Sequence, residues 1–557
     1  MVEYLIMQPG RYTIKLESEN LAIQAEAGQT VLEALIAAGI FLRTDCGGKG
    51  SCGKCRIKIL SSLTGSESAP DESEIKVLGQ PDLAAGLRLA CRLKVSENIS
   101  LIIPETSRLS AEVAQKGLPM LFDKLSQLKS QRSGIPDFYG VAVDLGTTTI
   151  AVYLCNLGNV AVTASTSARN PQTLFGDDVM SRISAIRLDP GLLARQQKMA
   201  VSAIEWGINT LCRSTRIDPA KITKMAVVGN STMIHIFAGE NPSSIGVFPY
   251  TPHFLEEKTL RAASVGFRFN PACQIRTLPL ITGFIGADIV GAALAAELSH
   301  CETGTMLVDV GTNGEIMYLG PDGLSATSCA TGPAFEGAAI SHGMHAVSGA
   351  IDAVKIDRSS GKAVCSIIQN NPARPKKAAG LCGTGVISTV AELYRAGLIL
   401  KDGAFERIAQ TAYLRLGDNG SPEYVLVPAE KTQDGRPITF TQKDVRAIQL
   451  AKGALRTGID LLCREAGTKF PRKILVAGAF GSYINSRDAI KIGMFPGVST
   501  DLIEVVGNAA GAGAILALFD ENAASRAAEL SRITKVLDLS SHPDFQETFI
   551  NSLSFPD

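Results

Sequence analysis

Residues 44–55 read Thr44-Asp45-Cys46-Gly47-Gly48-Lys49-Gly50-Ser51-Cys52-Gly53-Lys54-Cys55, with three cysteines and four glycines in twelve positions. A fourth cysteine, Cys91, follows after thirty-five residues, so the full pattern is C-x5-C-x2-C-x35-C. A [2Fe–2S] cluster needs four thiolates, and its common spacing C-x4-C-x2-C…C differs by one residue in the first gap. Glycines suit such a loop because its backbone must curl around the cluster, often at positive φ. The pattern therefore predicts a [2Fe–2S] cluster bound by Cys46, Cys52, Cys55 and Cys91.

Structural zinc is the main alternative for these four cysteines. Zinc sites usually combine two short C-x2–4-C pairs, and only Cys52 and Cys55 form one here. A chance grouping of buried cysteines is disfavoured because the loop is too polar and too rich in glycine to form core. The cluster is thus the favoured interpretation.

The composition limits the class of protein. A chain of 557 residues is too long for one core, so two to four domains are expected. Lys+Arg and Asp+Glu both number 54, and this balance argues against a nucleic-acid binder, which should carry a basic excess. No apolar run reaches the roughly 18 residues of a spanning helix, and no signal peptide is apparent. We therefore expect a cytoplasmic, reduced protein with no membrane or nucleic-acid partner.

Around the cysteine loop, the sequence predicts a small sheet domain. Residues 11–25 alternate between apolar and polar positions as a pair of strands. Thr30 and Glu33 form a capping-box pattern before an apolar run, which predicts a helix. Further strands are expected at 56–60 and 99–103. The order strand, strand, helix, cluster loop, strand is that of a β-grasp ferredoxin.

One sequence phrase occurs twice, 165 residues apart. An apolar strand runs into Asp144-Leu145-Gly146-Thr147-Thr148-Thr149, and another runs into Asp309-Val310-Gly311-Thr312-Asn313-Gly314-Glu315. The repetition indicates an internal duplication at domain scale. In each copy the aspartate can hold Mg²⁺ through water, the glycine lets the turn approach a phosphate, and threonine hydroxyls and N–H groups can bond its oxygens. One copy alone would suggest an ordinary hairpin turn, but two in matching context favour a phosphate site.

Two further glycine-rich elements follow. An apolar strand at 474–477 runs into Gly478-Ala479-Phe480-Gly481, where small residues leave room for adenine and ribose; tight strand–helix packing is the alternative. Residues 507–514 are almost all glycine and alanine, which predicts a helix packed closely on a neighbour and suited to a hinge. The second element is expected to be structural rather than ligand-binding.

Two Asp-x-Gly-Thr loops, an adenosine segment and an Ala/Gly helix, in this order, resemble the superfamily of acetate and sugar kinases, heat-shock chaperones and actin (ASKHA). Further stretches look like those of the reductive activators of corrinoid-dependent enzymes: 229–235, 283–288, 332–337, 382–385 and 541–556. Members of this family carry a [2Fe–2S] ferredoxin domain before the ASKHA-type domain. Some also have a separate middle domain after the linker, for which the short polar stretch 105–138 leaves no room.

The resemblance implies a multidomain α+β and α/β fold. The expected division is a β-grasp [2Fe–2S] ferredoxin domain (1–104), a partly helical linker (105–138), two duplicated ASKHA-type subdomains (139–302 and 303–520) and a C-terminal tail packed on the ATPase domain (521–557). The ASKHA-type domains of this family also imply a homodimer.

The resemblance further implies an ATP-hydrolysing enzyme that passes one electron from its cluster to inactive Co(II) corrinoid on a partner methyltransferase-system protein, restoring Co(I). This activity would serve anaerobic one-carbon metabolism and draw on a low-potential donor such as a ferredoxin or flavodoxin. Re-reduction is uphill, by about 2.3 kcal/mol per electron for each 100 mV. A cluster alone cannot supply this energy, whereas a nucleotide-driven cycle can. The alternatives are a redox-regulated small-molecule kinase and a non-catalytic electron carrier.

Residue roles follow from this interpretation. Asp144 and Asp309 would hold Mg²⁺, and Gly478 and Gly481 would flank the adenosine of ATP. Glu315 would orient the attacking water, or else it is a surface carboxylate. The phosphates would be held by Gly146, Thr147, Thr148, Gly311, Thr312 and Asn313.

The other polar and sulfur side chains have less specific expectations. The cations beside the cluster could steer an acidic donor: Lys49, Lys54 and Arg92. The eight remaining cysteines are expected to be small buried residues: Cys155, Cys212, Cys273, Cys301, Cys329, Cys365, Cys382 and Cys463. The histidines singled out are expected to be satisfied polar residues rather than metal ligands: His235, His342 and His345.

Overall fold

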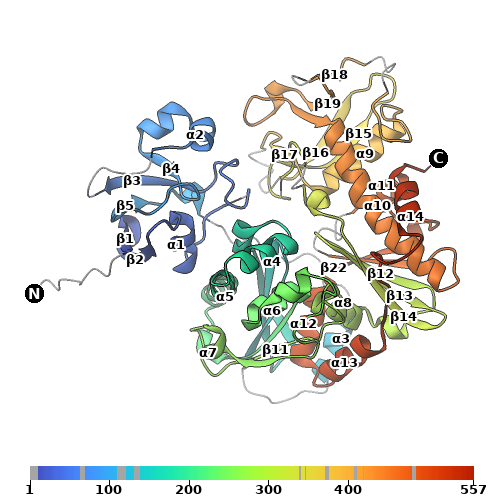
Figure 1. The fold of residues 1–557 in the computed structure, drawn as a ribbon, viewed down its shortest axis with the longest axis horizontal. Helices are drawn as coiled ribbons and strands as arrows, with labels where there is room; N and C mark the ends of the chain where they lie inside the picture. Colours follow the sequence, from blue (N-terminus) through green and yellow to red (C-terminus); the bar gives the residue numbers. More distant parts are fainter. Residues whose placement is uncertain are drawn as a thin grey trace, which may run out of the picture.

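The computed structural model describes residues 10–44, 46–62, 69–108, 121–130, 138–337, 340–344, 346–369, 376–406, 411–417, 420–478 and 484–556. Figure 1 shows the N-terminal domain in blue beside a middle domain in green, with most of the C-terminal domain, in yellow to red, on the other side; the red helices α12 (Ala509–Phe519) and α13 (Ala523–Ile533) lie among the green elements. Among these residues, no helix has the length and apolar character needed to span a membrane.

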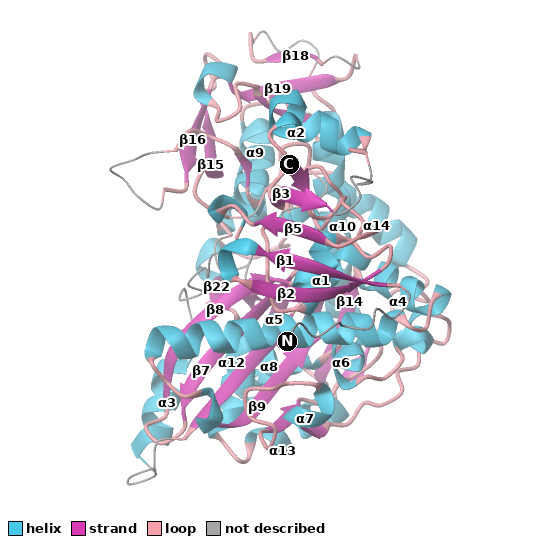
Figure 2. Cartoon of the chain, turned by 90° about the vertical axis from the view of Figure 1, so that its left-hand side faces the viewer, coloured by secondary structure: helices cyan, strands magenta, loops and turns pink. Residues whose placement is uncertain are grey.

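The N-terminal domain holds a five-stranded sheet with the order β2-β1-β5-β3-β4 (Figure 2). Its elements are β1 (Arg11–Leu16), β2 (Leu21–Glu26), α1 (Val31–Ala37), β3 (Arg56–Ser62), α2 (Glu72–Ala84), β4 (Leu87–Leu89) and β5 (Ile99–Ile102). The predicted element order is confirmed. At the start of α1, Glu33 N–H donates to Thr30 Oγ1 over 3.2 Å and Thr30 N–H donates to Glu33 Oε2 over 2.8 Å, so the predicted capping box is present.

Helix α2 was not predicted. Its first turn buries Glu74, and this carboxylate accepts bonds from Arg88 and from the backbone N–H of Leu89. The helix also contains Gly79, at φ 75°, and Pro81. These residues weaken the apolar periodicity by which a helix is recognised.

The middle domain is built on a six-stranded sheet with the order β10-β11-β9-β6-β7-β8. Its elements are β6 (Tyr139–Leu145), β7 (Thr149–Asn156), β8 (Ala161–Arg169), η3 (Pro171–Phe175), α4 (Val179–Leu188), α5 (Leu192–Thr215), β9 (Ile222–Gly229), α6 (Ser231–Ala238), β10 (Thr259–Arg261), α7 (Ala262–Val265), β11 (Gln274–Thr277) and α8 (Ala287–Ala296).

The C-terminal domain has a second six-stranded sheet, with the order β22-β21-β12-β13-β14-β23, and two small sheets of three strands. Its elements are β12 (Thr305–Val310), β13 (Gly314–Gly320), β14 (Gly323–Cys329), η7 (Pro333–Glu336), β15 (Ala350–Ile356), β16 (Ala363–Ile367), β17 (Gly380–Leu381), α9 (Gly383–Arg395), β18 (Leu414–Leu416), β19 (Pro422–Val427), β20 (Ile438–Thr441), α10 (Gln442–Glu465), β21 (Lys473–Ala477), α11 (Ser486–Lys491), β22 (Ile503–Gly507), α12 (Ala509–Phe519), α13 (Ala523–Ile533), β23 (Lys535–Val536) and α14 (Phe545–Leu553).

The topology of the two large sheets confirms the duplication. In the middle domain, β6 pairs antiparallel with β7 and parallel with β9, and β7 pairs antiparallel with β8. In the C-terminal domain, β12 pairs in the same way with β13 and β21, and β13 with β14. Each Asp-x-Gly-Thr motif thus lies at the same hairpin of an equivalent sheet.

Helix α12 joins the two halves. It follows β22 in the chain, yet it packs on α8 and on strands β6 and β9 of the middle domain. A Cβ atom on Gly513 would lie 2.2 Å from the carbonyl oxygen of Gly291, so only glycine allows this approach of the two helices. The predicted small-residue helix, packed closely on a neighbour, is therefore present.

The linker also holds a helix, α3 (Leu121–Ser130). Leu121 is buried, and Lys124 Nζ donates to the carbonyl oxygen of Ala295 over 2.6 Å and lies 3.3 Å from the carboxylate of Glu297. These contacts attach the linker to the end of α8.

The C-terminal tail packs against α10. Helix α14 lies along α10, and the Phe555 ring that follows it is fully buried. Lys452 of α10 is 1% exposed; its Nζ donates to the carbonyl oxygen of Ser554 over 2.6 Å and lies 5.3 Å from the centroid of the Phe555 ring. A buried lysine therefore holds the tail in place.

Burial lowers the pKa of Lys452 from 10.5 to about 7. The unfolded chain therefore binds one more proton than the folded chain between about pH 7 and 10, and stability should rise with pH across this window. Lys452→Met should remove this pH-dependent change in the free energy of unfolding, which is on the order of a few kcal/mol across the window. Urea unfolding of both proteins at several pH values measures the difference between their slopes, in which all other titrating groups cancel. Equal slopes would contradict this assignment.

Candidate nucleotide site and cluster loop

The cluster loop curls as the sequence predicts. Its four glycines all have positive φ: Gly47 at 60°, Gly48 at 82°, Gly50 at 79° and Gly53 at 64°. Residues with a Cβ atom rarely adopt this conformation. Cys55 and Cys91 are buried, whereas Cys46 and Cys52 are partly exposed.

The four cysteine side chains lie in two pairs. A hydrogen bond from Cys52 lowers the pKa of the Cys46 thiol, and a hydrogen bond from Cys91 lowers that of Cys55. The pKa of Cys91 is raised by the same contact and by burial. Two pairs of thiols fit a [2Fe–2S] cluster, in which each iron takes two cysteines. The residues present therefore suit this cofactor. Asp45 lies outside the described residues.

The two Asp-x-Gly-Thr motifs face each other across the domain boundary. We call the turn after β6 loop 1 and the turn after β12 loop 2. The hydroxyl oxygens of Thr148 in loop 1 and Thr312 in loop 2 are 3.2 Å apart. Both turns are closed by the N–H of the motif glycine, but over different lengths: Gly146 N–H donates to the carbonyl oxygen of Thr149, three residues on, over 3.0 Å, and Gly311 N–H donates to that of Asn313, two residues on, over 3.2 Å.

Four carboxylates lie around these loops. Asp144 and Asp309 stand near the ends of β6 and β12, Asp288 is in the first turn of α8, and Glu315 pairs with Asp309 across the β12–β13 ladder. Burial raises the pKa of Asp144 to about 7 and that of Asp309 to about 8; the charge of Asp288 adds to both shifts. Burial also raises the pKa values of Asp288 and Glu315.

This arrangement suits a cation. Carboxylates that repel each other in a buried space are stabilised as anions by a nearby positive charge. Within the described residues, no three His, Cys, Asp or Glu side chains converge on one point as direct ligands of a metal ion. Mg²⁺ commonly keeps several of its waters, so these carboxylates fit a hydrated ion held through water.

Glu315 lies in this acidic group and is 7% exposed. The alternative that it is a surface carboxylate is therefore wrong. Sequence reasoning gave no role to Asp288, although its stretch 283–288 was noted. Only the fold places α8 beside the two loops.

Several polar residues that orient the loops were also missed. Asn508, the N-cap of α12, donates from Nδ2 to Asp144 Oδ2 over 2.8 Å and to the Tyr153 hydroxyl over 3.0 Å. Asn230 Nδ2 donates to Thr147 Oγ1 over 2.9 Å. In loop 2, Thr312 Oγ1 donates to Glu336 Oε1 over 2.8 Å. The residues that were missed are Asn508, Asn230 and Glu336. Each lies in a stretch singled out in the sequence, but the residue that it bonds is distant along the chain.

The adenosine segment begins close to loop 2. Gly478 has φ 98°, and a Cβ atom there would lie 2.7 Å from Asp309 Oδ1. The glycine therefore makes room for the aspartate at the start of loop 2. Gly481 lies outside the described residues.

The remaining expectations have mixed outcomes. His235 is satisfied on both ring nitrogens: Nδ1 donates to the carbonyl oxygen of Ser231 over 2.7 Å, and Nε2 accepts from His253 N–H over 3.1 Å. His342 Nε2 lies 3.5 Å from Thr439 Oγ1, and His345 lies outside the described residues. Of the eight extra cysteines, the buried ones are Cys155, Cys212, Cys273, Cys329, Cys382 and Cys463; Cys301 and Cys365 are partly exposed.

The cations beside the cluster are largely engaged within the protein. Lys49 pairs with Asp177 of the middle domain, and Arg92 pairs with Asp71 over 2.5 Å. Lys54 is exposed. The steering role predicted for Lys49 and Arg92 therefore competes with existing ion pairs.

Comparison with known families agrees with these three domains. A 2Fe–2S iron–sulfur cluster binding domain matches residues 14–96, a RACo middle region matches 139–301, and the C-terminal domain of RACo, the ASKHA domain, matches 303–557. The expectation that the chain lacks a middle domain was wrong, because the family's middle region is the first half of the duplication.

The relatives described here cover between 66% and 98% of the chain. The corrinoid activation enzyme RamQ of Eubacterium limosum is 30% identical over 98% of this chain and 99% of its own length. The [Co(II) methylated amine-specific corrinoid protein] reductase of Methanosarcina barkeri is 27% identical over 66% of this chain and 67% of its own. A solved structure, titled reductive activator for corrinoid, iron–sulfur protein, has a TM-score of 0.69 and 27% identity over 98% of both chains. The paired cysteines, the facing loops and these matches show that the chain belongs to the family of corrinoid activation enzymes, the reductive activators built from a ferredoxin domain and an ASKHA domain.

Proposed function

We propose that this chain uses ATP to drive one electron from a [2Fe–2S] cluster onto the cobalt of a corrinoid on a partner protein, converting inactive Co(II) to Co(I). One observation carries the proposal: the two loops face each other at 3.2 Å in the same chain as the two pairs of cluster cysteines. The printed names of two relatives, a corrinoid activation enzyme and a Co(II) corrinoid protein reductase, support it.

The division of labour follows from energy. A [2Fe–2S] cluster held by Cys46, Cys52, Cys55 and Cys91 supplies a one-electron carrier. Each 100 mV by which the donor is too weak costs about 2.3 kcal/mol. ATP binding and hydrolysis can provide this free energy if the states of the protein before and after hydrolysis interact differently with the partner. The cysteine loop and the nucleotide loops would thus serve one reaction.

The site residues would act as follows. Backbone N–H groups and hydroxyls of loops 1 and 2 would hold the phosphates, from Gly146, Thr147 and Thr148 on one side and Gly311, Thr312 and Asn313 on the other. Asp144 and Asp309 would hold Mg²⁺ through water, which supplies charge stabilisation for phosphoryl transfer. Glu315, in register with Asp309, would orient the attacking water, and Gly478 and Gly481 would flank the adenosine.

The proposal also includes the setting of the reaction. The electron would come from a low-potential carrier such as a ferredoxin or flavodoxin, and the protein would work in the cytoplasm as a homodimer through its ASKHA-type domains. The twelve cysteines are all free of disulfides, which fits a reducing compartment.

The reaction can be followed by light absorption. Purified protein with its cluster is mixed with a corrinoid protein in the Co(II) state, Mg-ATP and a reductant. We expect the Co(II) spectrum to be replaced by that of Co(I), and the rate of ATP hydrolysis to depend on the corrinoid protein. No Co(I) with any corrinoid protein would overturn the proposal. Phosphoryl transfer to a metabolite without a protein partner would favour the kinase alternative.

A further inference from the structure

The cluster loop contacts a short part of the middle domain, residues 169–182, which we call the coupling segment. Lys49 pairs with Asp177, whose carboxylate also lies 3.7 Å from Arg169. Gly48 packs against Leu174 so closely that a Cβ atom on the glycine would lie 2.2 Å from Leu174 Cδ2. The contacts of the cluster loop with the middle domain therefore depend on the position of the coupling segment.

The other side of the same segment holds loop 1. Asn170 N–H donates to the carbonyl oxygen of Thr148 over 2.7 Å, and Asn170 Nδ2 donates to that of Gly146 over 2.9 Å. Arg182 donates to the carbonyl oxygen of Thr147 over 2.5 Å. Asn170 and Arg182 are both fully buried. Three successive carbonyl groups of loop 1 are thus fixed to the coupling segment.

Phosphate binding would change the position of loop 1. In this structure the hydroxyl oxygens of Thr148 and Thr312 are 3.2 Å apart and bond to each other. A phosphate oxygen that accepts a bond of usual length from both would hold them about 4.5 Å apart. Where the loops separate by about 1 Å to make this room, loop 1 cannot move without breaking its three bonds or shifting the coupling segment.

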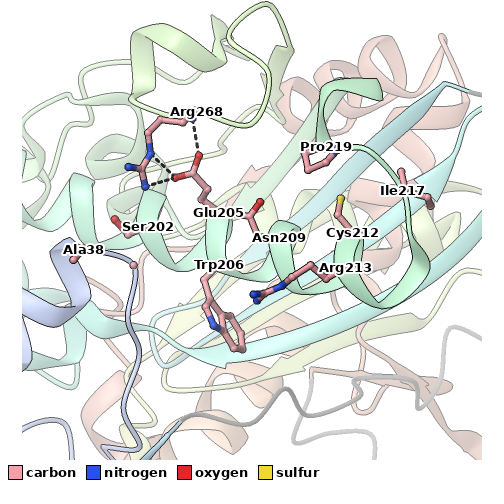
Figure 3. A pocket seen from close by; sticks show the side chains of 11 residues that line it. Ala38, Ser202, Glu205, Trp206, Asn209, Cys212, Arg213, Ile217, Pro219 and Arg268 are labelled. Atoms are coloured by element: carbon pink, nitrogen blue, oxygen red, sulfur yellow. Dashed lines mark hydrogen bonds and ion pairs between the residues drawn. The ribbon is translucent and has the colours of Figure 1, made fainter. Parts of the chain in front are cut away.

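The two domains also touch between α1 and α5, beside an open hollow. Helix α1 lies against α5, where Glu33 pairs with Arg195 over 2.7 Å, and the rings of Phe41 and Trp206 have centroids 5.8 Å apart. Beside them is a hollow of about 430 Å³ between the end of α1 and α5 (Figure 3). Interfaces of this kind between domains commonly open and close.

The contacts that hold the cluster domain on the middle domain are Lys49 with Asp177, Gly48 with Leu174, and α1 with α5; we call this contact surface the seat. We propose that the coupling segment links loop 1 to the seat, so that nucleotide binding weakens these contacts and frees the cluster loop for a partner. Asp177 is the positioning residue on the cluster side, and Asn170 and Arg182 are those on the nucleotide side. The inference rests on the proposed binding of ATP at loops 1 and 2. The coupling is reciprocal: if bound ATP weakens docking of the cluster domain by some factor, then undocking of the cluster domain raises the affinity for ATP by the same factor.

The single tryptophan of the chain, Trp206, reports on the seat, because it lies against Phe41 of the cluster domain. In full-length protein with its cluster, Mg-ATP should increase Trp206 emission and shift it to longer wavelength as the domain leaves. Asp177→Asn should show part of this change without nucleotide and should bind ATP about 5-fold tighter or more. Glu257→Gln, a partly exposed ion-pair residue elsewhere in the middle domain, is the matched control and should have no effect.

The outcomes separate this inference from the function. If calorimetry shows ATP binding, but emission does not respond and Asp177→Asn binds ATP as the wild type does, the coupling is refuted and the proposed function stands. Tighter docking of the cluster domain with ATP would refute the proposed loosening of the seat. Absence of any ATP binding would overturn both proposals.

Discussion

Asp309→Asn should lower the rate of ATP-dependent Co(II) reduction by about 10²-fold or more, while the cluster spectrum stays as in the wild type. Asparagine has nearly the shape of aspartate but lacks the charge that would hold hydrated Mg²⁺. Asp309 is also the group whose pKa burial raises to about 8, so its charge is costly unless a cation offsets it. The rate of Co(I) formation with saturating Mg-ATP measures the effect.

The melting temperature of Asp309→Asn gives an independent test of the same role. A neutral side chain removes repulsion among Asp144, Asp288 and Asp309, so the melting temperature should not fall. Asp322→Asn, in the exposed turn at the far end of the β13–β14 hairpin, is the matched control and should leave the rate unchanged. If Asp309→Asn retained more than about a tenth of the wild-type rate, the role of loop 2 would be wrong.

Cys91→Ser should abolish electron delivery and the visible absorption of the cluster, but leave ATP binding in place. Cys91 is 6% exposed and lies beside Cys55, and a serine hydroxyl is a poor substitute for a soft thiolate ligand. Loops 1 and 2 belong to the middle and C-terminal domains, so retained ATP binding shows that these two domains are folded; any change in ATP affinity should be an increase, as the coupling proposed above requires.

The matched control is Cys301→Ser. Its thiol is partly exposed and donates to the carbonyl oxygen of Ala296 over 3.6 Å, a contact that a hydroxyl can also make. This variant should keep the iron content and activity of the wild type. An unchanged iron content in Cys91→Ser, or bound zinc in the wild type, would contradict the assignment of the cluster.

Local patterns were sufficient for much of the fold. The capping box at Thr30 and Glu33, the alternating strands and the repeated Asp-x-Gly-Thr phrase all depend on residues close together in the chain, and each gives the expected element. The duplication was visible because both copies keep the same strand and turn. The two small sheets of the C-terminal domain carry no such signal and were not predicted.

The missing parts of the site depend on distant contacts. Asn508 begins a helix that was expected to be only structural, yet its side chain reaches Asp144, 364 residues earlier. Asp288 and Glu336 join the loops only because α8 and η7 pack beside them. The helix α2 was hidden because a buried ion pair replaces part of its apolar face. Local sequence patterns cannot predict these contacts, because the residues that make them are far apart in the chain.

The measurement that tests the central claim most directly is the amount of Co(I) formed at a fixed reduction potential. The potential is set by a redox buffer a few tenths of a volt above that needed to reduce the free corrinoid protein, a deficit of several kcal/mol per electron at about 2.3 kcal/mol per 100 mV. Co(I) should accumulate with Mg-ATP and remain absent without it. Equal amounts of Co(I) with and without Mg-ATP would contradict the claim that the nucleotide site drives the electron uphill.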